Sequence, residues 1–210
     1  MITRIEEKLL INNSNKFLKV NKKKLKSIYP KRQIISIYYD DKNFKSYVDS
    51  EEGILPREKN RVRFYTNIKQ YFSLGLGIND LASGEINIER KTTDFHTKRK
   101  KTKKISNSQI PFTMLDSNNF IINPVSVVIY ERSYFMFFDG IRVTLDENLQ
   151  FAKINKLFKI KNIITTNDKI LELKLENDKI HNYNIRNSLN INTLRYSKYC
   201  KSIELLYDVN

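Results

Sequence analysis

The stretch Arg57-Glu-Lys-Asn-Arg-Val-Arg-Phe-Tyr65 decides how this chain is expected to fold. Its basic residues recur at every second position, and Val62 and Phe64 lie between them, which is the period of a β-strand. On such a strand Arg57, Lys59, Arg61 and Arg63 share one face. Neighbouring side chains on that face are about 7 Å apart, so these like charges repel one another unless an anion lies between them.

The same alternation recurs elsewhere in the chain. Arg4 to Ile11, Glu85 to Lys91, Ile141 to Asp146 and Leu171 to Glu176 each place charged residues on one face and Ile, Leu or Val on the other, and Val128, Tyr130, Arg132 and Tyr134 share a face of a further strand. For any single strand, a polar face in water is the simpler interpretation. Because the pattern repeats over six strands and concentrates Arg and Lys, we predict an antiparallel barrel, closed or nearly closed, with flanking helices. Its apolar faces would pack outward, and its basic faces would line a tunnel.

Composition limits the classes of protein to consider. The 210 residues carry 38 Lys and Arg against 23 Asp and Glu, a formal charge of +15, which favours an anionic partner or reflects a compositional bias. No Gly/Ser or Pro-rich linker divides the chain, so residues 1–210 are expected to form one domain. Cys200 is the only cysteine, and no apolar run is long enough for a signal peptide or a membrane span. We therefore expect a cytoplasmic protein, and docking on a membrane protein stays open.

A few segments are expected to break the strand pattern. Residues 15–29 have helical spacing and are expected to end at Pro30, residues 182–189 fit a short helix, and residues 66–76 fit either structure. Residues 92–123 are polar and basic, and they are expected to form a long, mobile connection.

The charged residues point to phosphate chemistry. Arg presents a planar fork to phosphate oxygens, and Lys presents a mobile point charge. Glu6, Glu89 and Glu172 would repel phosphate unless each held a divalent metal or were neutralised by the lysine two residues on, and both remain open. A zinc site is not expected, because the chain has a single cysteine and no pair of histidines at ligand spacing. Asp40, Asp41 and Asp49 are expected to tie strands and turns together.

Ten short motifs, in order along nearly the whole chain, resemble those of one family. They are Arg4-Ile-Glu-Glu-Lys8, Ile35-Ser-Ile-Tyr-Tyr-Asp-Asp41, Tyr47-x-Asp49 with Gly53, Arg57 to Tyr65, Glu89-Arg-Lys91, Lys98-Arg-Lys100, Pro124 to Arg132 with its final Tyr-Glu-Arg, Ile141 to Asp146, Leu171-Glu-Leu-Lys174 and Ser197-Lys-Tyr199. The chain resembles the VTC domain of inorganic polyphosphate polymerases, in the CYTH-like group of triphosphate tunnel metalloenzymes.

This resemblance implies an eight-stranded tunnel of the α+β class and assigns its residues. The residues implied to be catalytic are Arg61, Arg63, Lys91, Arg132 and Arg142. Those implied to bind substrate are Lys8, Lys59, Lys98, Lys100, Lys174 and Lys198. Glu172, with Glu6 and Glu89, would hold Mn²⁺ or Mg²⁺. The implied reaction transfers the γ-phosphate of ATP to a growing polyphosphate chain, with positioning and charge neutralisation as the main sources of rate.

Two departures from the family pattern bear on this assignment. Lys98-Arg-Lys100 lies within a longer basic run, so either lysine fits the tunnel position. Arg4 stands where hydrolase branches of the group have a glutamate, which favours the polymerase branch.

Two other functions remain open. One is hydrolysis of tripolyphosphate or a nucleoside triphosphate in the same tunnel, and the other is binding of a polyanion without turnover. A nucleic acid partner is not expected, because few aromatic residues are interleaved with the arginines and no helix-turn-helix or zinc-finger pattern is present.

Overall fold

The computed structural model describes residues 5–11, 17–19, 21, 23–66, 77, 85–95, 97–137, 140–155, 157–175 and 196–209. Contacts within the chain divide it into two compact units. Unit 1 comprises Met1–Arg32, Tyr130–Leu149 and Thr166–Tyr196, and unit 2 comprises Gln33–Ile129, Gln150–Thr165 and Ser197–Asn210. Three of the boundaries between the units fall within long strands, at residues 25–40, 121–137 and 142–154. That residues 1–210 form a single domain stays a prediction.

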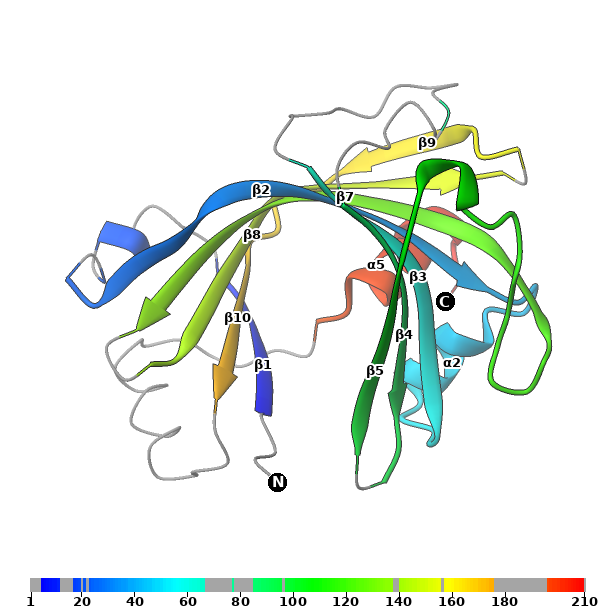
Figure 1. Cartoon of the computed structure of the whole chain (residues 1–210), viewed down its shortest axis with the longest axis horizontal. Helices are drawn as coiled ribbons and strands as arrows, with labels where there is room; N and C mark the ends of the chain where they lie inside the picture. The colour runs from blue at the N-terminus through cyan, green and yellow to red at the C-terminus, as the bar shows by residue number, and fades with distance from the viewer. Residues whose placement is uncertain are drawn as a thin grey trace. The chain divides into compact units, whose positions relative to one another are not determined.

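The fold is mainly antiparallel β-sheet with few helices, as predicted, and it belongs to the α+β class (Figure 1). The elements are β1 (Ile5–Leu10), β2 (Leu25–Asp40), α2 (Lys45–Glu51), β3 (Arg57–Thr66), β4 (Glu85–Thr93), β5 (Lys98–Ile105), the 3-10 helix η1 (Asn107–Gln109), β6 (Met114–Leu115), β7 (Ile121–Phe137), β8 (Arg142–Ile154), β9 (Ile160–Thr165), β10 (Ile170–Leu175) and α5 (Lys198–Tyr207). The strand order is β1-β10-β8-β7-β2-β3-β4-β5, with β6 on β7 and β9 on β8. Closure of this order into a tunnel stays a prediction.

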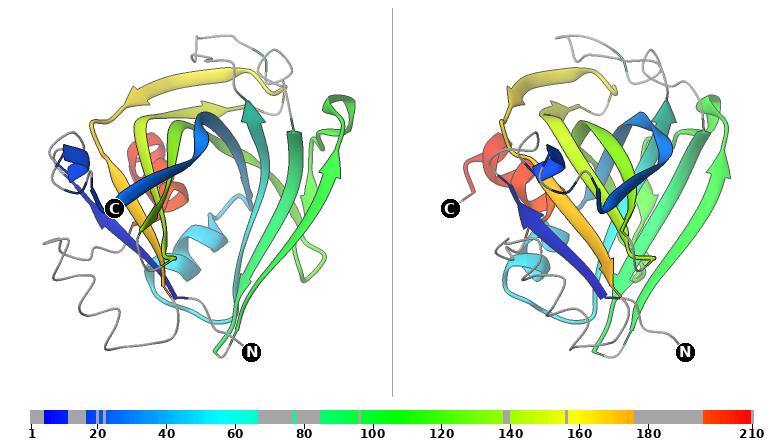
Figure 2. Two further views of the ribbon diagram at one scale, coloured as in Figure 1. Left: turned by 60° about the vertical axis from the view of Figure 1, so that its left-hand side comes forward. Right: turned by 90° about the vertical axis from the view of Figure 1, so that its left-hand side faces the viewer.

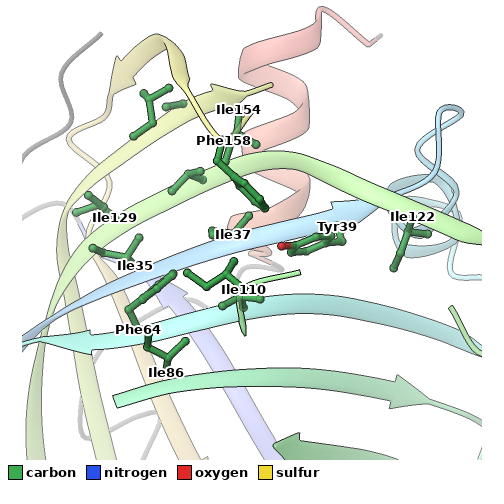
Figure 3. Close-up of a cluster of buried hydrophobic side chains, with 14 residues drawn as sticks. Ile35, Ile37, Tyr39, Phe64, Ile86, Ile110, Ile122, Ile129, Ile154 and Phe158 are labelled. Carbon is green, nitrogen blue, oxygen red and sulfur yellow. The ribbon is translucent and has the colours of Figure 1, made fainter. Parts of the chain in front are cut away.

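In unit 2, strands β2, β3, β4 and β5 pair in sequence, and alternation gives their sheet two different faces. Val62 pairs with Ile37 on one side and with Ile88 on the other, and this face packs into a core of buried apolar side chains (Figure 3). We call it the apolar face. Arg61 pairs with Tyr38 and with Glu89 on the opposite face, which we call the basic face. The alternation predicted for residues 57–65 is confirmed, because Val62 and Phe64 are fully buried in that core.

In unit 1, strands β1, β10 and β8 pair in that order. Val143, Leu145, Leu171 and Leu173 pack with Ile11, Phe17, Phe137 and Ile141 in a second apolar core. The opposite face of these strands carries Thr144, Asp146 and Glu172, all of them buried. The alternation predicted for both segments is therefore confirmed, and these three polar side chains are withdrawn from water.

Helices α2 and α5 lie side by side in unit 2 (Figure 2). Asp40, at the end of β2, holds them in place. Its carboxylate accepts hydrogen bonds from the backbone N–H of Ser46 at 3.0 Å and of Tyr47 at 3.2 Å, and from the Tyr199 hydroxyl. Asp40 thus ties a strand to both helices, as the sequence predicts. This anchorage fixes the start of α5, which carries Lys198.

Two predictions about secondary structure are wrong. Within residues 15–29 only 17–19 are described as helical, and Leu25–Tyr29 opens strand β2, where the Tyr29 ring stands edge-on to Tyr134. Residues 92–123 are not one long connection, because Lys98–Ile105 pairs with β4 along eight residues. In both cases pairing with neighbouring strands outweighs local preference. Of the segment 66–76, only Thr66 is described, as the last residue of β3, and residues 67–76 and 182–189 lie outside those that the structure describes.

Within the described ranges, no helix is long and apolar enough to cross a bilayer.

Candidate functional site

Glu89 is the centre of a charged cluster on the basic face of unit 2. Arg61 donates from Nε to Glu89 Oε2 at 2.7 Å, and its Nη2 lies 2.5 Å from the same oxygen. Lys100, from β5, forms an ion pair with the other carboxylate oxygen, Oε1, and Arg63 Nη1 lies 3.8 Å from Oε2. Glu89 is only 2% exposed. Three cations therefore share one buried carboxylate, and that carboxylate fixes the direction of the Arg61 guanidinium.

The charge on Glu89 is stable over a wide pH range. Burial raises the pKa of a carboxyl group, but Arg61, Arg63 and Lys100 together outweigh burial and lower the pKa of Glu89 to about 2. Its contacts are those of a counter-ion. The metal-binding role that the sequence analysis expects of Glu89 stays a prediction.

This shift predicts a pH dependence of stability. Because the folded pKa lies below the unfolded value of 4.5, the ionised carboxylate stabilises the fold above about pH 4.5, and this contribution is lost as pH falls toward about 2. The difference between the unfolded and folded pKa values of Glu89 corresponds to about 3 kcal/mol of stability. We expect Glu89→Gln to lower the free energy of unfolding by about that amount at neutral pH, with the gap closing on acidification. Urea titrations over a pH series measure it, and a gap that did not change with pH would contradict the assignment.

Strand β2 supplies a hydroxyl group to each of the two arginines. Ser36 lies opposite Arg63 and accepts a hydrogen bond from its Nε at 3.2 Å. Tyr38 lies opposite Arg61 and accepts a hydrogen bond from its Nη1 at 3.4 Å, while the Arg61 guanidinium lies 5.9 Å from the centre of the Tyr38 ring. Burial raises the pKa of Tyr38, but Arg61 and Arg63 more than offset it and lower the pKa to about 8. Arg61 and Arg63 are thus each held between a hydroxyl group on β2 and the Glu89 carboxylate on β4.

The start of helix α5 adds Lys198 to the cations near the basic face and contacts Lys59 of β3. Ser197 caps the helix by accepting from the backbone N–H of Cys200, and it also accepts a hydrogen bond from Lys59 Nζ at 2.9 Å. Lys198 is buried at the start of the helix and acts electrostatically on Tyr38. Lys59, Lys198 and Arg61 therefore converge on Tyr38 and the adjoining Tyr199 ring, 5.1 Å from it.

The register also lines up three lysines on neighbouring strands. Lys59 on β3 lies opposite Lys91 on β4, and Lys91 lies opposite Lys100 on β5. Like charges directly opposite each other destabilise a sheet. This row makes the basic face suited to an anion. Lys98 lies on the same face, opposite Thr93, and its side chain is exposed.

A second polar cluster lies in unit 1. Arg132 donates from Nε and Nη2 to the two carboxylate oxygens of Asp146, at 2.6 and 2.7 Å. Its Nη2 also lies 3.6 Å from Glu172, and its guanidinium lies 5.4 Å from the centre of the Tyr130 ring. Burial alone would lower the pKa of Arg132, but Asp146 and Glu172 raise it well above the usual value. Asp146 is fully buried, so this fork is held rigidly.

The other residues predicted for unit 1 lie in two cross-strand rows. Lys8 lies opposite Glu172, which lies opposite Thr144, and Glu6 lies opposite Lys174, which lies opposite Arg142. The Arg142 side chain is exposed, and that of Lys174 is half-buried. The side chain of Glu6 lies outside what the structure describes.

Glu172 has surroundings that fit a divalent cation. Thr144, its neighbour on β8, has a buried hydroxyl oxygen that makes no hydrogen bond within the described part of the chain. Carboxylate and hydroxyl oxygens are hard donors, and Mg²⁺ commonly uses one or two carboxylates together with substrate phosphates and water. Among the described residues, no group of three or more His, Cys, Asp or Glu side chains could hold a metal ion. A metal at Glu172 would therefore depend on oxygens from the substrate.

Some of these residues cannot be found from the sequence. The alternation identifies Arg61, Arg63 and Glu89, but the contacts of Ser36 and Tyr38 with the arginines depend on the β2–β3 register. Asp146 shares a strand face with Arg142 in the sequence, yet its partner is Arg132, from another strand. The sequence indicates Ser36 and Tyr38 only in that they are two residues apart on a strand and therefore share a face.

Comparisons with known proteins extend these observations. The profile of the family described as "VTC domain" matches residues 3–207. The PH1819 protein from Pyrococcus horikoshii has a similar solved structure, with a TM-score of 0.56 and 14% identity over 97% of this chain and 99% of that one. A candidate adenylate cyclase from Vibrio parahaemolyticus has a TM-score of 0.54 and 14% identity, over 93% of this chain and 95% of that one.

HpAC1 from Hippeastrum is similar in structure as well, with a TM-score of 0.54 and 10% identity over 97% of both chains. At these identities the likeness concerns the fold. Among curated proteins, none matches the chain. The family profile covers nearly all of the sequence, and the chain therefore belongs to the VTC domain family.

Proposed function

We propose that this protein is a metal-dependent polyphosphate polymerase, which transfers the γ-phosphate of ATP to the end of an inorganic polyphosphate chain. The observation that carries the proposal is the cluster in unit 2, where Arg61, Arg63 and Lys100 surround the single buried carboxylate of Glu89. With Lys59, Lys91 and Lys198 beside it, this face has a large excess of positive charge. Membership of the VTC domain family supports a phosphate chain as the anion.

The first role of these residues is to bind and orient phosphate. Arg61 is held by Glu89 and Tyr38, and Arg63 by Ser36, so their forks need little reorganisation when phosphate oxygens arrive. Lys59, Lys91, Lys98 and Lys100 add mobile charges along the same face. Lys198, in unit 2, is assigned to the same role. In unit 1, Arg132 is held by Asp146 in the same manner, and we assign it, with Arg142, Lys8 and Lys174, to the binding of phosphate groups as well.

The proposed reaction forms one bond and breaks one. A terminal oxygen of the polyphosphate attacks the γ-phosphorus of ATP, the bond from that phosphorus to the bridging oxygen breaks, and ADP leaves with the electron pair. The arginines neutralise the charge that spreads over the transferring phosphoryl oxygens. A Mn²⁺ or Mg²⁺ ion at Glu172 would supply further charge neutralisation when bound. Glu6 and Glu89 remain proposed as further metal ligands.

The closed eight-stranded tunnel belongs to this proposal, and it rests on the alternation of the strands and on the family. The partners also belong to this proposal: they are ATP and polyphosphate, and nucleic acid is not among them. A cytoplasmic location is proposed as well.

Binding of a short phosphate chain tests the choice of ligand. We expect calorimetric titration with tripolyphosphate to show binding that weakens as salt is raised, and we expect inorganic phosphate and single-stranded DNA to bind at least tenfold more weakly, about 1.4 kcal/mol. Equal affinity for DNA and tripolyphosphate would contradict the proposed ligand class.

Hydrolysis is the second candidate, because HpAC1, whose fold is similar, has a dominant triphosphatase activity. In this reaction water would take the place of the polyphosphate terminus. The ratio of free phosphate to ADP separates the two. A hydrolase of ATP releases one phosphate for each ADP, whereas a polymerase releases ADP with little free phosphate.

A further inference from the structure

Strand β5 carries two rows of cations, and only one of them lies on the basic face. Lys98, Lys100 and Lys104 alternate with Arg99, Lys101 and Lys103 along the strand. In the register with β4, Lys101 lies opposite Arg90 and Lys103 lies opposite Ile88, so this second row belongs to the apolar face. All three of its side chains are exposed. The second row faces away from Glu89 and its partners, so phosphate transfer does not explain it.

A short hairpin on the same side exposes apolar residues. In the pairing of β6 with β7, Leu115 lies opposite Ile121 and Met114 lies opposite Ile122. Met114 and Ile122 pack into the core of unit 2, so Leu115 and Ile121 point the other way. Leu115 is 51% exposed, Ile121 64%, and Phe120 at the turn 66%. Single exposed apolar residues are normal, but three within seven residues on one hairpin indicate a contact surface.

The hairpin and the second row lie close together. Arg90 Nη2 donates a hydrogen bond to the carbonyl oxygen of Leu115, and Arg90 is the residue opposite Lys101. The backbone N–H of Ser117 donates to Glu58 Oε1 at 3.1 Å. The hairpin therefore lies against β3 and β4, on the face that carries Lys101. We call Leu115, Phe120 and Ile121, together with Arg99, Lys101 and Lys103, the docking surface.

Acidic groups near the docking surface are already engaged. The Asp116 carboxylate accepts hydrogen bonds from the backbone N–H groups of Asn118 and Phe120, both at 2.8 Å. Glu58 accepts from Asn60 at 2.7 Å and lies 4.0 Å from Arg90. The second row of β5 is thus the main charge that the docking surface presents outward, and it is positive.

We propose that the docking surface binds a membrane surface that contains anionic lipids. Leu115, Phe120 and Ile121 enter the boundary between headgroups and acyl chains, while Arg99, Lys101 and Lys103 contact lipid phosphates. Long basic side chains beside exposed apolar ones suit this interface, because their stems lie along apolar groups while their charges reach the headgroups. Lipid is favoured over an acidic protein because the exposed apolar side chains lie at the turn of a hairpin and on the strand residues that flank it. This binding is separate from the proposed phosphate transfer, which uses the opposite face of the sheet.

Sedimentation with lipid vesicles tests the proposal on the full chain. We expect binding to vesicles of phosphatidylcholine with phosphatidylglycerol and little binding to phosphatidylcholine alone, at about 0.15 M salt. Leu115→Ser with Ile121→Ser, and separately Lys101→Glu with Lys103→Glu, should each reduce the partition coefficient at least about tenfold. The matched control is Lys98→Glu with Lys104→Glu, which makes the same charge change on the other face and should reduce binding far less.

Two outcomes would overturn the proposal. If both charge-reversal pairs weakened binding equally, the vesicles would be responding only to the overall charge. If anionic vesicles did not bind at all, an acidic protein surface would become the better partner. Because the chain has no tryptophan, Phe120→Trp adds a single probe, whose emission should shift to shorter wavelength on anionic vesicles only. Turnover of ATP without lipid is measured alongside, so that failure of membrane binding and failure of the proposed enzyme are distinguished.

Discussion

Replacing Arg61 with methionine is expected to lower kcat for ATP turnover about 10³-fold, in line with the loss of an arginine that stabilises a transferring phosphoryl group. The reason is geometric. Glu89 and Tyr38 hold the Arg61 fork in one direction, so the oriented charge disappears with the side chain and lysine would restore only part of it. Steady-state assays of ADP release measure the effect. We expect the kcat of Arg61→Lys to fall between that of the unchanged protein and that of Arg61→Met.

Arg99→Met is the matched control for this experiment. Arg99 has the same side chain, but it lies on the exposed second row of β5, and its replacement should change kcat less than twofold, about 0.4 kcal/mol. The free energy of unfolding of each variant shows whether a loss of activity comes from misfolding, since Arg61→Met leaves Glu89 with fewer cations. A folded Arg61→Met protein with normal kcat would exclude Arg61 from the reaction.

Replacing Glu172 with glutamine is expected to reduce turnover at least about 10³-fold while leaving tripolyphosphate binding intact or slightly stronger. Glutamine preserves size but removes the charged oxygen that a divalent cation needs, and it also removes a negative charge close to Arg132. Titration of Mn²⁺ against activity should show that the metal requirement rises in the variant. Calorimetry with tripolyphosphate measures the binding that remains.

Glu147→Gln provides the comparison within unit 1. Glu147 lies 3.8 Å from Lys31 and is only partly buried, so its replacement should leave turnover and metal dependence unchanged. If Glu172→Gln kept full turnover, Glu172 would not be the metal ligand. If the variant instead lost both turnover and tripolyphosphate binding, the role of Glu172 would be to hold Arg132 in place.

The sequence predicts those parts of the fold in which side-chain alternation and burial agree. Val62 and Phe64 are buried, and Arg61 and Arg63 lie on the opposite face, because a strand allows no other arrangement once one face enters a core. Leu171 and Leu173 follow the same rule. Alternation therefore identifies which residues share a face without any knowledge of their partners.

The sequence does not predict which strands become neighbours. Lys98 to Ile105 has too many like charges to indicate a strand, and it forms one because β4 offers it a full row of backbone partners and because Glu89 accepts Lys100. The Leu25–Tyr29 segment has helical spacing, but it extends a strand that pairs further along the chain. The contact of Tyr38 with Arg61 likewise depends on register, and composition contains no signal for it.

The product formed from ATP tests the central claim most directly. The purified protein is incubated with ATP and Mn²⁺, with and without a short polyphosphate primer, and the products are resolved by gel electrophoresis and phosphorus NMR. The proposed function predicts long-chain polyphosphate with an equal amount of ADP, and Glu172→Gln should form neither. Free phosphate as the sole inorganic product would contradict the polymerase and favour the hydrolase, and tight polyphosphate binding without turnover would leave a binding module.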